Sequence, residues 1–443
     1  MKDPIWKKTN NTDQANTDQA NNNQVDPAIM AFMAGEDVEL DKQLLQFDLK
    51  ASAAHVSGLQ QINILSAEEA EQLKQGLRQL EEEVAAGTRG LDSSFEDGHS
   101  AIECWLTEML GDAGAKIHTG RSRNDQVAVA LRLFMKDRLS QLQHICTSVA
   151  SVLLKRVETE AMIPMAGYTH LQSAMPSSAG LWLAGHAEAF IDNAELAAFT
   201  TQWLDASPLG TASGFGVNLD LPRKEVADDL GFHRLVVNPQ YAQNSRGKIE
   251  LQALSVLSAC TLDLRRLAWD LSLFTTHEFN FVKLPAQYYT GSSIMPNKHN
   301  PDTVELLRAV HGVVQGAQTE IASVLSLPSG YQRDLQATKP PLMRAFSKGI
   351  EALALLPDLL SGFEWQVERM HASISPEMLA TDRATNLARE GIPFREAYKI
   401  AAAEIGTMNM DNIQKSLAQR SSPGGCGNLG VDILLARLGA LRN

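Results

Sequence analysis

The chain has 443 residues, of which 44% are hydrophobic, and a formal net charge of −13 at pH 7. This acidic balance argues against a nucleic-acid-binding protein, because phosphate backbones are bound by basic surfaces. No apolar run approaches the roughly 20 residues that span a membrane, and the N-terminal sequence lacks the apolar core of a signal peptide. We therefore predict a cytoplasmic protein.

The cysteines lie far apart and show no CxxC spacing; they are Cys104, Cys146, Cys260 and Cys426. We predict reduced, mostly buried thiols rather than disulfides or a zinc site. The sequence also has no HExxH motif and no clustered acidic spacing, so we predict no metal and no cofactor.

The first 118 residues form a predicted N-terminal domain. Residues 10–24 repeat NTDQA and contain almost nothing that could be buried, which predicts a disordered arm. A helix is expected over residues 66–86, beginning near Ser66.

The middle of the chain contains apolar residues that alternate in steps of four and three. The three series are Met135, Leu139, Leu142, Cys146, Val149, Leu153; Leu257, Cys260, Leu264, Leu267, Leu271, Phe274; and Leu307, Val310, Val314, Ala317, Ile321, Val324. This period of 3.5 residues predicts long helices that pack nearly parallel. We therefore predict a central helix-bundle domain over residues 119–370.

Two further helices are expected over residues 179–204 and 343–372, the second kinked at Pro357. The pattern shortens after residue 371, which predicts a C-terminal helical domain over 371–443. There the segment SSPGGCGNLG lacks the Lys-Ser/Thr ending of a phosphate loop, so we interpret it as a turn. No stretch alternates strongly enough to predict a sheet, and the expected fold class is all-α.

One segment near the third apolar series is typical of an anion site. Residues 291–302 read GSSIMPNKHNPD, with Asn300 suited to cap a helix and the next proline suited to its first position. This arrangement would bring Ser292, Lys298 and Asn300 to the positive end of that helix. Taken alone, such a segment is more often a Gly/Ser loop that only caps a helix.

The same segment resembles the signature GSSxMPxKxNP of the fumarase/aspartase superfamily. Four other segments resemble argininosuccinate lyases: IHTGRSRNDQ at 117–126, AGYTHLQ at 166–172, YQRDLQATK at 331–339 and GIPFRE at 391–396. Together with EDGHSAIE near residue 96, they cover most of the chain in order. The resemblance implies three mainly helical domains, and a homotetramer whose active sites are shared between subunits.

The resemblance also implies a reaction. Argininosuccinate lyases form arginine and fumarate by removing a proton beside a carboxylate and expelling the guanidino nitrogen, which requires a base, fixed positive charge and an acid. By resemblance Ser292 is the base, Lys298 holds the aci-carboxylate, His170 serves the leaving nitrogen and Glu305 orients His170. Taken singly, a histidine is more often structural, and Glu305 could be only a helix-dipole partner.

A set of substrate-binding residues follows from the same resemblance: Ser122, Arg123, Asn124, Thr169, Asn300, Tyr331, Gln336 and Lys339. These side chains offer many donors and few acceptors, which suits a small-molecule polycarboxylate substrate. From the residues alone, the turn at 122–124 could equally be an N-capping turn for the helix that follows.

The sequence departs from the usual argininosuccinate lyase pattern at residues 207–223 and 244–250, and Gln332 replaces the usual asparagine. These departures leave open which of several related substrates the protein prefers. Two alternatives therefore stay open: a sister lyase acting on adenylosuccinate or a modified argininosuccinate, and a non-catalytic, crystallin-like structural tetramer. The HTGRSRNDQ segment argues against most sister lyases, and retention of all four catalytic candidates argues against the structural tetramer.

Overall fold

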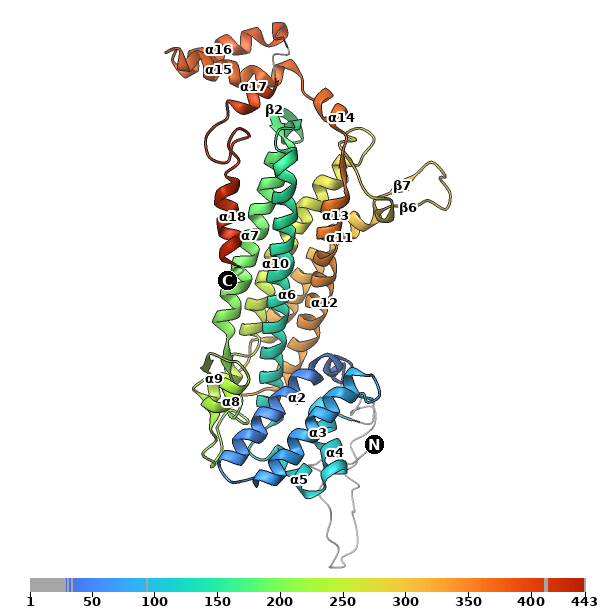
Figure 1. Ribbon diagram of the computed structural model, residues 1–443, viewed down its shortest axis with the longest axis vertical. Helices are drawn as coiled ribbons and strands as arrows, with labels where there is room; N and C mark the ends of the chain where they lie inside the picture. The colour runs from blue at the N-terminus through green and yellow to red at the C-terminus, as the bar shows by residue number, and fades with distance from the viewer. Residues whose placement is uncertain (1–28, 30–31, 33–34, 93–94, 410–412, 442–443) are drawn as a thin grey trace, which may run out of the picture. The chain divides into compact units, whose positions relative to one another are not determined.

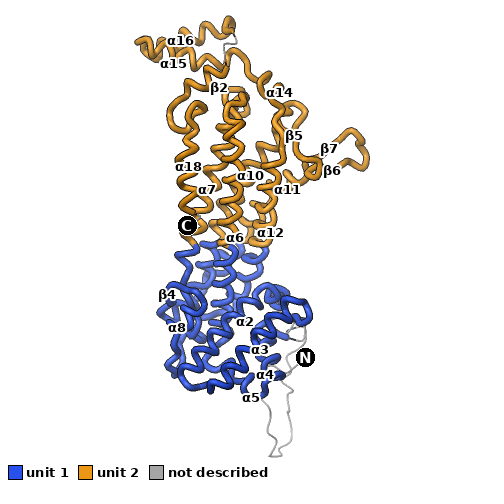
Figure 2. Tube along the Cα trace, viewed as in Figure 1, with its two compact units in different colours: residues 1–138, 201–253, 318–344 blue, residues 139–200, 254–317, 345–443 orange. Residues whose placement is uncertain are grey.

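The structure is a computed structural model that describes residues 29, 32, 35–92, 95–409 and 413–441. Helices dominate it (Figure 1), as the sequence predicts. It divides into two compact units, unit 1 with residues 1–138, 201–253 and 318–344, and unit 2 with residues 139–200, 254–317 and 345–443 (Figure 2). The predicted arm at 10–24 lies outside the described residues, and the domain boundaries at 118 and 370 stay predictions.

Unit 1 contains a cluster of N-terminal helices: α2 Asp37–Gln61, α3 Ala67–Ala85, α4 Gly98–Leu110, α5 Asp112–Ala115 and the short η1 Lys116–His118. They share a core that includes Leu49, Leu59 and Leu106. Helix α3 begins with a capping box, because the Ser66 hydroxyl accepts from Glu69 N and the Glu69 carboxylate accepts from Ser66 N. The predicted helix start near Ser66 is therefore confirmed.

The remainder of unit 1 consists of short elements and of those parts of the long helices that belong to this unit. Its elements are the start of α6 Arg123–Glu160, the end of α7 Ala179–Leu204, β3 Ala206–Ser207 paired in parallel with β4 Arg234–Leu235, α8 Arg223–Asp229, α9 Pro239–Asn244, the start of α10 Lys248–Phe274, the end of α11 Asp302–Val324, η3 Arg333–Thr338 and the start of α12 Lys339–Ala354. Gly247 joins α9 to α10 at φ 77°, and a Cβ there would lie 2.1 Å from Leu325 Cδ2. Only glycine fits that turn.

Unit 2 holds the remaining lengths of α6, α7, α10, α11 and α12. Cys146 Sγ of α6 lies 3.8 Å from Cys260 Sγ of α10, and Trp182 of α7 donates to Asp270 of α10 over 2.8 Å. The first two apolar series are buried throughout, and the third is buried except at Val310 and Val324, which are half-buried. The predicted bundle of long helices is confirmed.

The expected single helix over 343–372 is wrong. The structure has α12, α13 Leu356–Gly362, the short strand β8 Glu364–Trp365 and α14 Val367–Ala372, with β8 antiparallel to β5 Val282–Lys283. Pro357 cannot donate a backbone hydrogen bond, and its ring would clash with the carbonyl four residues earlier. The chain therefore starts a new helix instead of bending one.

Two hairpins in unit 2 were missed by the sequence analysis because their residues do not alternate. Strand β1 Pro164–Thr169 pairs with β2 Gln172–Ser178, and β6 Thr290–Gly291 pairs with β7 His299–Asn300. Helix α11 starts at Asp302, and its first hydrogen bond runs from Glu305 N to Pro301 O over 3.1 Å. Asn300 therefore lies in β7, and its predicted place as the helix cap is wrong by one residue.

The C-terminal part of unit 2 contains short elements: η4 Pro376–Leu379, α15 Ala380–Arg389, α16 Phe394–Glu404, η5 Ile405–Thr407, α17 Ile413–Ala418 and α18 Val431–Ala440; η2 Ala286–Tyr288 lies earlier. Segment 421–430 is a turn, as predicted, closed by a bridge between Gly425 and Asn428. All four cysteines are free, and three are buried, which agrees with the prediction. Within the described ranges, no helix is long and apolar enough to cross a membrane.

Candidate active site

The β6–β7 hairpin carries Ser292, the predicted base, and Lys298, the lysine predicted to hold the aci-carboxylate. The Ser292 hydroxyl oxygen accepts hydrogen bonds from Met295 N over 3.0 Å and from Ile294 N over 3.4 Å. A second turn follows, in which Lys298 N donates to Met295 O over 3.1 Å. N–H groups aimed at an oxygen favour its negatively charged form. Two backbone donors, which the sequence analysis did not identify, thus point at Ser292 Oγ.

The Lys298 side chain is exposed, and no carboxylate lies within ion-pair distance of it among the described residues. Its ammonium group is therefore open to an anionic ligand. The helix dipole is less available, because α11 has Asp302 and Glu305 in its first turn. Glu305 is 51% exposed, and its carboxylate lies 4.0 Å from Arg308 Nη2.

His170 lies at the exposed tip of the β1–β2 hairpin, next to Thr169. Both central residues of this two-residue turn are left-handed, with φ 55° at His170 and 58° at Leu171. Such turns normally contain Asn-Gly, because a left-handed backbone disfavours side chains such as leucine. Backbone strain of this kind is concentrated at functional sites.

The base of the β1–β2 hairpin is fixed by packing. The Tyr168 ring lies 5.3 Å from the Phe279 ring, and Ala166 N donates to Ser373 Oγ over 3.2 Å. Both hairpins belong to unit 2, and Figure 1 shows the β6–β7 hairpin projecting well away from the β1–β2 hairpin. A single chain therefore does not bring His170 to Ser292, and their assigned roles stay predictions.

In unit 1, the turn at 122–124 begins α6. Ser122 Oγ accepts from Asn124 N over 3.3 Å, and Ser122 N donates to Asp125 Oδ1 over 2.9 Å, so the turn does cap the helix. Arg123 Nη1 lies 2.8 Å from Glu96 Oε2, and Arg123 Nη2 donates to Ser100 Oγ over 3.0 Å. Substrate binding by the side chains of Ser122, Arg123 and Asn124 stays a prediction.

Lys339 is only 3% exposed, and its Nζ lies 2.5 Å from Asp37 Oδ1 and 2.8 Å from Asp41 Oδ1. Burial lowers the pKa of Lys339, but the two carboxylates outweigh it and raise the pKa above its ordinary value. Its charge is thus already paired. As a substrate ligand, which remains a prediction, Lys339 would have to exchange a carboxylate of the protein for one of the substrate.

The structure joins Lys339 and Arg123 through the segment at 96–98. Asp41 Oδ2 accepts from Gly98 N over 2.9 Å, and Asp97 Oδ2 lies 3.4 Å from Arg123 Nη1. The sequence analysis missed these carboxylates, although EDGHSAIE was a signal for the acids at 96 and 97.

The other two predicted residues of unit 1 are Tyr331 and Gln336. Tyr331 is half-buried just before η3. Gln336 is half-buried within η3, and its Nε2 approaches the backbone at Gly35, 4.0 Å from where a Cβ would stand.

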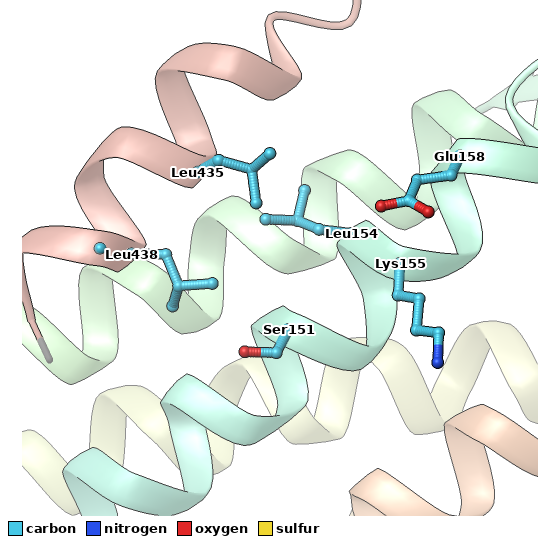
Figure 3. A pocket seen from close by; sticks show the side chains of 7 residues that line it. Ser151, Leu154, Lys155, Glu158, Leu435 and Leu438 are labelled. Carbon is cyan, nitrogen blue, oxygen red and sulfur yellow. The ribbon is translucent and has the colours of Figure 1, made fainter.

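A cavity of about 300 Å³ lies between α6 and α18 in unit 2 (Figure 3). Leu154, Leu435 and Leu438 form its apolar part, and Ser151, Lys155 and Glu158 add polar groups. None of the predicted site residues lines it. We therefore do not assign the predicted chemistry to this cavity.

Comparisons with known proteins identify the family. A family model described as "Lyase" matches residues 15–316. The chain is 54% identical to the argininosuccinate lyase of Xanthomonas oryzae pv. oryzae (strain PXO99A), over 94% of this chain and 97% of the relative. It is also 54% identical to that of Stenotrophomonas maltophilia (strain R551-3), over 100% of both chains.

Solved structures agree on the fold. An EDDS lyase in complex with formate superposes with a TM-score of 0.79 at 23% identity, covering 93% of this chain and 90% of that one. Class II fumarase from Schistosoma mansoni gives a TM-score of 0.70 at 16% identity, covering 93% and 94%. With its full-length identity to curated enzymes, the chain belongs to the argininosuccinate lyase family of the fumarase/aspartase superfamily.

Proposed function

We propose that this protein cleaves L-argininosuccinate into L-arginine and fumarate in arginine biosynthesis. The observation that carries this proposal is the 54% identity, over the full length, to argininosuccinate lyases. The reaction removes a proton from the succinyl carbon beside one carboxylate, then breaks the C–N bond so that the electron pair leaves with the guanidino nitrogen. It needs no oxidant or reductant.

Ser292 is the proposed base. A serine hydroxyl is a very weak acid, so its alkoxide must be stabilised by nearby donors or cations. The hydrogen bonds from Met295 N and Ile294 N support this role, since both would strengthen as Oγ becomes negative. Proton removal then places a second negative charge on the substrate carboxylate, and the open Lys298 ammonium is the proposed partner of that charge.

His170 is the proposed source of the proton for the leaving nitrogen, and Glu305 is proposed to orient it. The exposed tip of a strained two-residue turn is a suitable support for such a residue, because it can reach a site outside its own hairpin. Thr169 and Asn300 on the two hairpins, and the predicted set in unit 1, are proposed to bind the substrate's carboxylates and its arginine half.

We further propose a homotetramer in the cytoplasm, with active sites that combine segments of different subunits. Large apolar side chains on two neighbouring helices support an interface, since α10 exposes Leu262 by 41% and Trp269 by 47%, and α11 exposes Leu306 by 70%. Arg308 of α11 lies 4.1 Å from the Trp269 ring, so these two helices are adjacent. Monomeric proteins rarely leave such a surface uncovered.

One preparation tests the function. The purified protein is given argininosuccinate and, separately, adenylosuccinate, and fumarate release is followed by ultraviolet absorbance. We expect turnover of argininosuccinate alone; turnover of adenylosuccinate instead would establish the sister-lyase alternative, and no turnover of either would revive the structural one. His170→Asn should cut turnover by about 100-fold or more, while the turn is retained because asparagine tolerates a left-handed backbone.

A further inference from the structure

Asp125 is a completely buried carboxylate that the proposed mechanism does not use. Its Oδ1 accepts from Ser122 N over 2.9 Å, and its Oδ2 accepts from Gly210 N and Ala212 N, each over 2.9 Å. The three backbone donors favour the charged form of this carboxylate, although burial outweighs them and raises the pKa of Asp125 above its ordinary value. One side chain thus connects the substrate-binding turn at 122–124 to a loop more than 80 residues later in the chain.

The loop can offer these two amides because its backbone is left-handed, with φ 82° at Gly210 and 51° at Ala212. Alanine at a positive φ is unusual and is kept only where surrounding contacts impose it. The loop is also held from its other side. Arg223 donates through Nε to Leu209 O over 3.0 Å and through Nη2 to Val236 O over 2.7 Å.

The loop belongs to segment 207–223, one of the places where this sequence departs from the usual argininosuccinate lyase pattern. We propose that Asp125 is a positioning residue through which this loop sets the place of Ser122 and Asn124 for substrate binding. The inference rests on the proposed function. It makes the loop a determinant of substrate affinity, although no loop residue needs to touch the substrate.

Asp125→Asn tests the connection, because an amide group keeps the size but turns one acceptor atom into a donor. At least one of the two segments must then lose its hydrogen bond. We expect the KM for argininosuccinate to rise at least about tenfold, while kcat changes by less than about threefold. Hydrogen exchange should quicken in both the 118–124 and the 207–216 peptides.

Arg223→Met is the comparison variant, since it loosens the same loop from its other side and leaves the hydrogen bonds of Asp125 in place. It should lower the melting temperature and quicken exchange near residues 207–216, and KM should rise by a smaller factor than in Asp125→Asn, because the turn stays bonded to the loop. Gly210→Ala is the second variant, used if Asp125→Asn does not fold. A Cβ there would lie 2.9 Å from Arg223 Cγ, and alanine is strained at a φ of 82°, so the loop backbone that donates to Asp125 should shift and KM should rise.

An unchanged KM in folded Asp125→Asn, or in Gly210→Ala when Asp125→Asn does not fold, overturns the proposal. A rise of KM in Arg223→Met larger than in Asp125→Asn also overturns it, because the loop would then act on KM by a route other than Asp125. A wild-type protein that releases no fumarate overturns the proposed function instead. The exchange of peptide 118–124 in Asp125→Asn still decides, in that case, whether the loop and the turn are linked.

Discussion

The β6–β7 hairpin and the polar cluster around Lys339 both contain predicted site residues, yet they differ in how their charges are paired. On the hairpin, Lys298 is exposed and has no carboxylate partner in the described part of the chain. In the cluster, Lys339 is buried between Asp37 and Asp41. The ammonium group of Lys298 can therefore bind an anionic ligand, whereas the ammonium group of Lys339 is already paired within the fold.

This difference predicts separate consequences of substitution. Removing a group from the hairpin should affect turnover and leave stability unchanged, because few folded contacts are lost. Removing a carboxylate from the cluster should destabilise the protein, because the buried charge of Lys339 loses one of its two partners.

The largest expected effect is on the hairpin. Ser292→Ala should lower kcat by about 10²–10⁴-fold, the usual contribution of a general base, with no change of melting temperature. Fumarate release and thermal denaturation measure the two quantities. Ser293→Ala is the control, since it removes a neighbouring exposed hydroxyl and should retain most activity. Equal losses in both variants would contradict the assignment of the base.

The next largest expected effect is a loss of stability on substitution in the polar cluster around Lys339. Asp41→Ala should lower the free energy of unfolding by about 3–5 kcal/mol, because Lys339 and Gly98 N both lose an acceptor. Glu351→Ala breaks an exposed ion pair with Lys348 and should cost less than about 1 kcal/mol. Urea denaturation compares them. Similar losses of unfolding free energy in the two variants would show that burial does not make the Asp41–Lys339 pair more important than an exposed ion pair.

The third prediction concerns pH and two buried histidines of unit 1. Burial, together with Arg121, lowers the pKa of His55 to about 3, whereas for His99 the Asp48 carboxylate outweighs burial and raises the pKa to about 9. As the pH falls below about 6.5, His55 binds a proton in the unfolded chain but stays neutral in the folded protein, so the free energy of unfolding decreases. As the pH rises from about 6.5 toward 9, the unfolded chain loses a proton that folded His99 keeps, and stability again falls.

Stability should therefore be greatest near pH 6.5, with each histidine contributing a slope of about 1.4 kcal/mol per pH unit on its own side. Urea midpoints measured across this range test it. His99→Gln should flatten the alkaline side alone, and His55→Gln should reduce the slope on the acidic side alone. An alkaline slope that survives in His99→Gln would remove His99 as its cause.

The smallest expected effect is on the strained turn of the β1–β2 hairpin. Leu171→Gly should stabilise the protein by about 1 kcal/mol, because glycine adopts a left-handed backbone without strain. Leu196→Gly, at a partly exposed helical position of α7, should destabilise it by a similar amount. Calorimetry compares the two, and a loss of stability in both would show that the turn stores no strain.

The sequence predicted best where a local pattern repeats. Steps of four and three located the buried faces of α6 and α10, because one face of a helix must be apolar over its whole length. It predicted less well where a short segment depends on its partner strand. The β1–β2 hairpin and the place of Asn300 in β7 depend on strand pairing, which no local sequence pattern predicts.

Resemblance to family motifs marked Ser292, Lys298, His170 and Arg123 as candidate site residues from the chain alone, and their roles stay predictions. Only the tertiary structure decided which of them are free and which are paired. Asp37 and Asp41 lie about 300 residues before Lys339 in the sequence, and Asp125 meets Gly210 more than 80 residues away. Such contacts depend on burial and on the path of the backbone, so the sequence determined the family and the chemistry, while the fold decided how each charge is held.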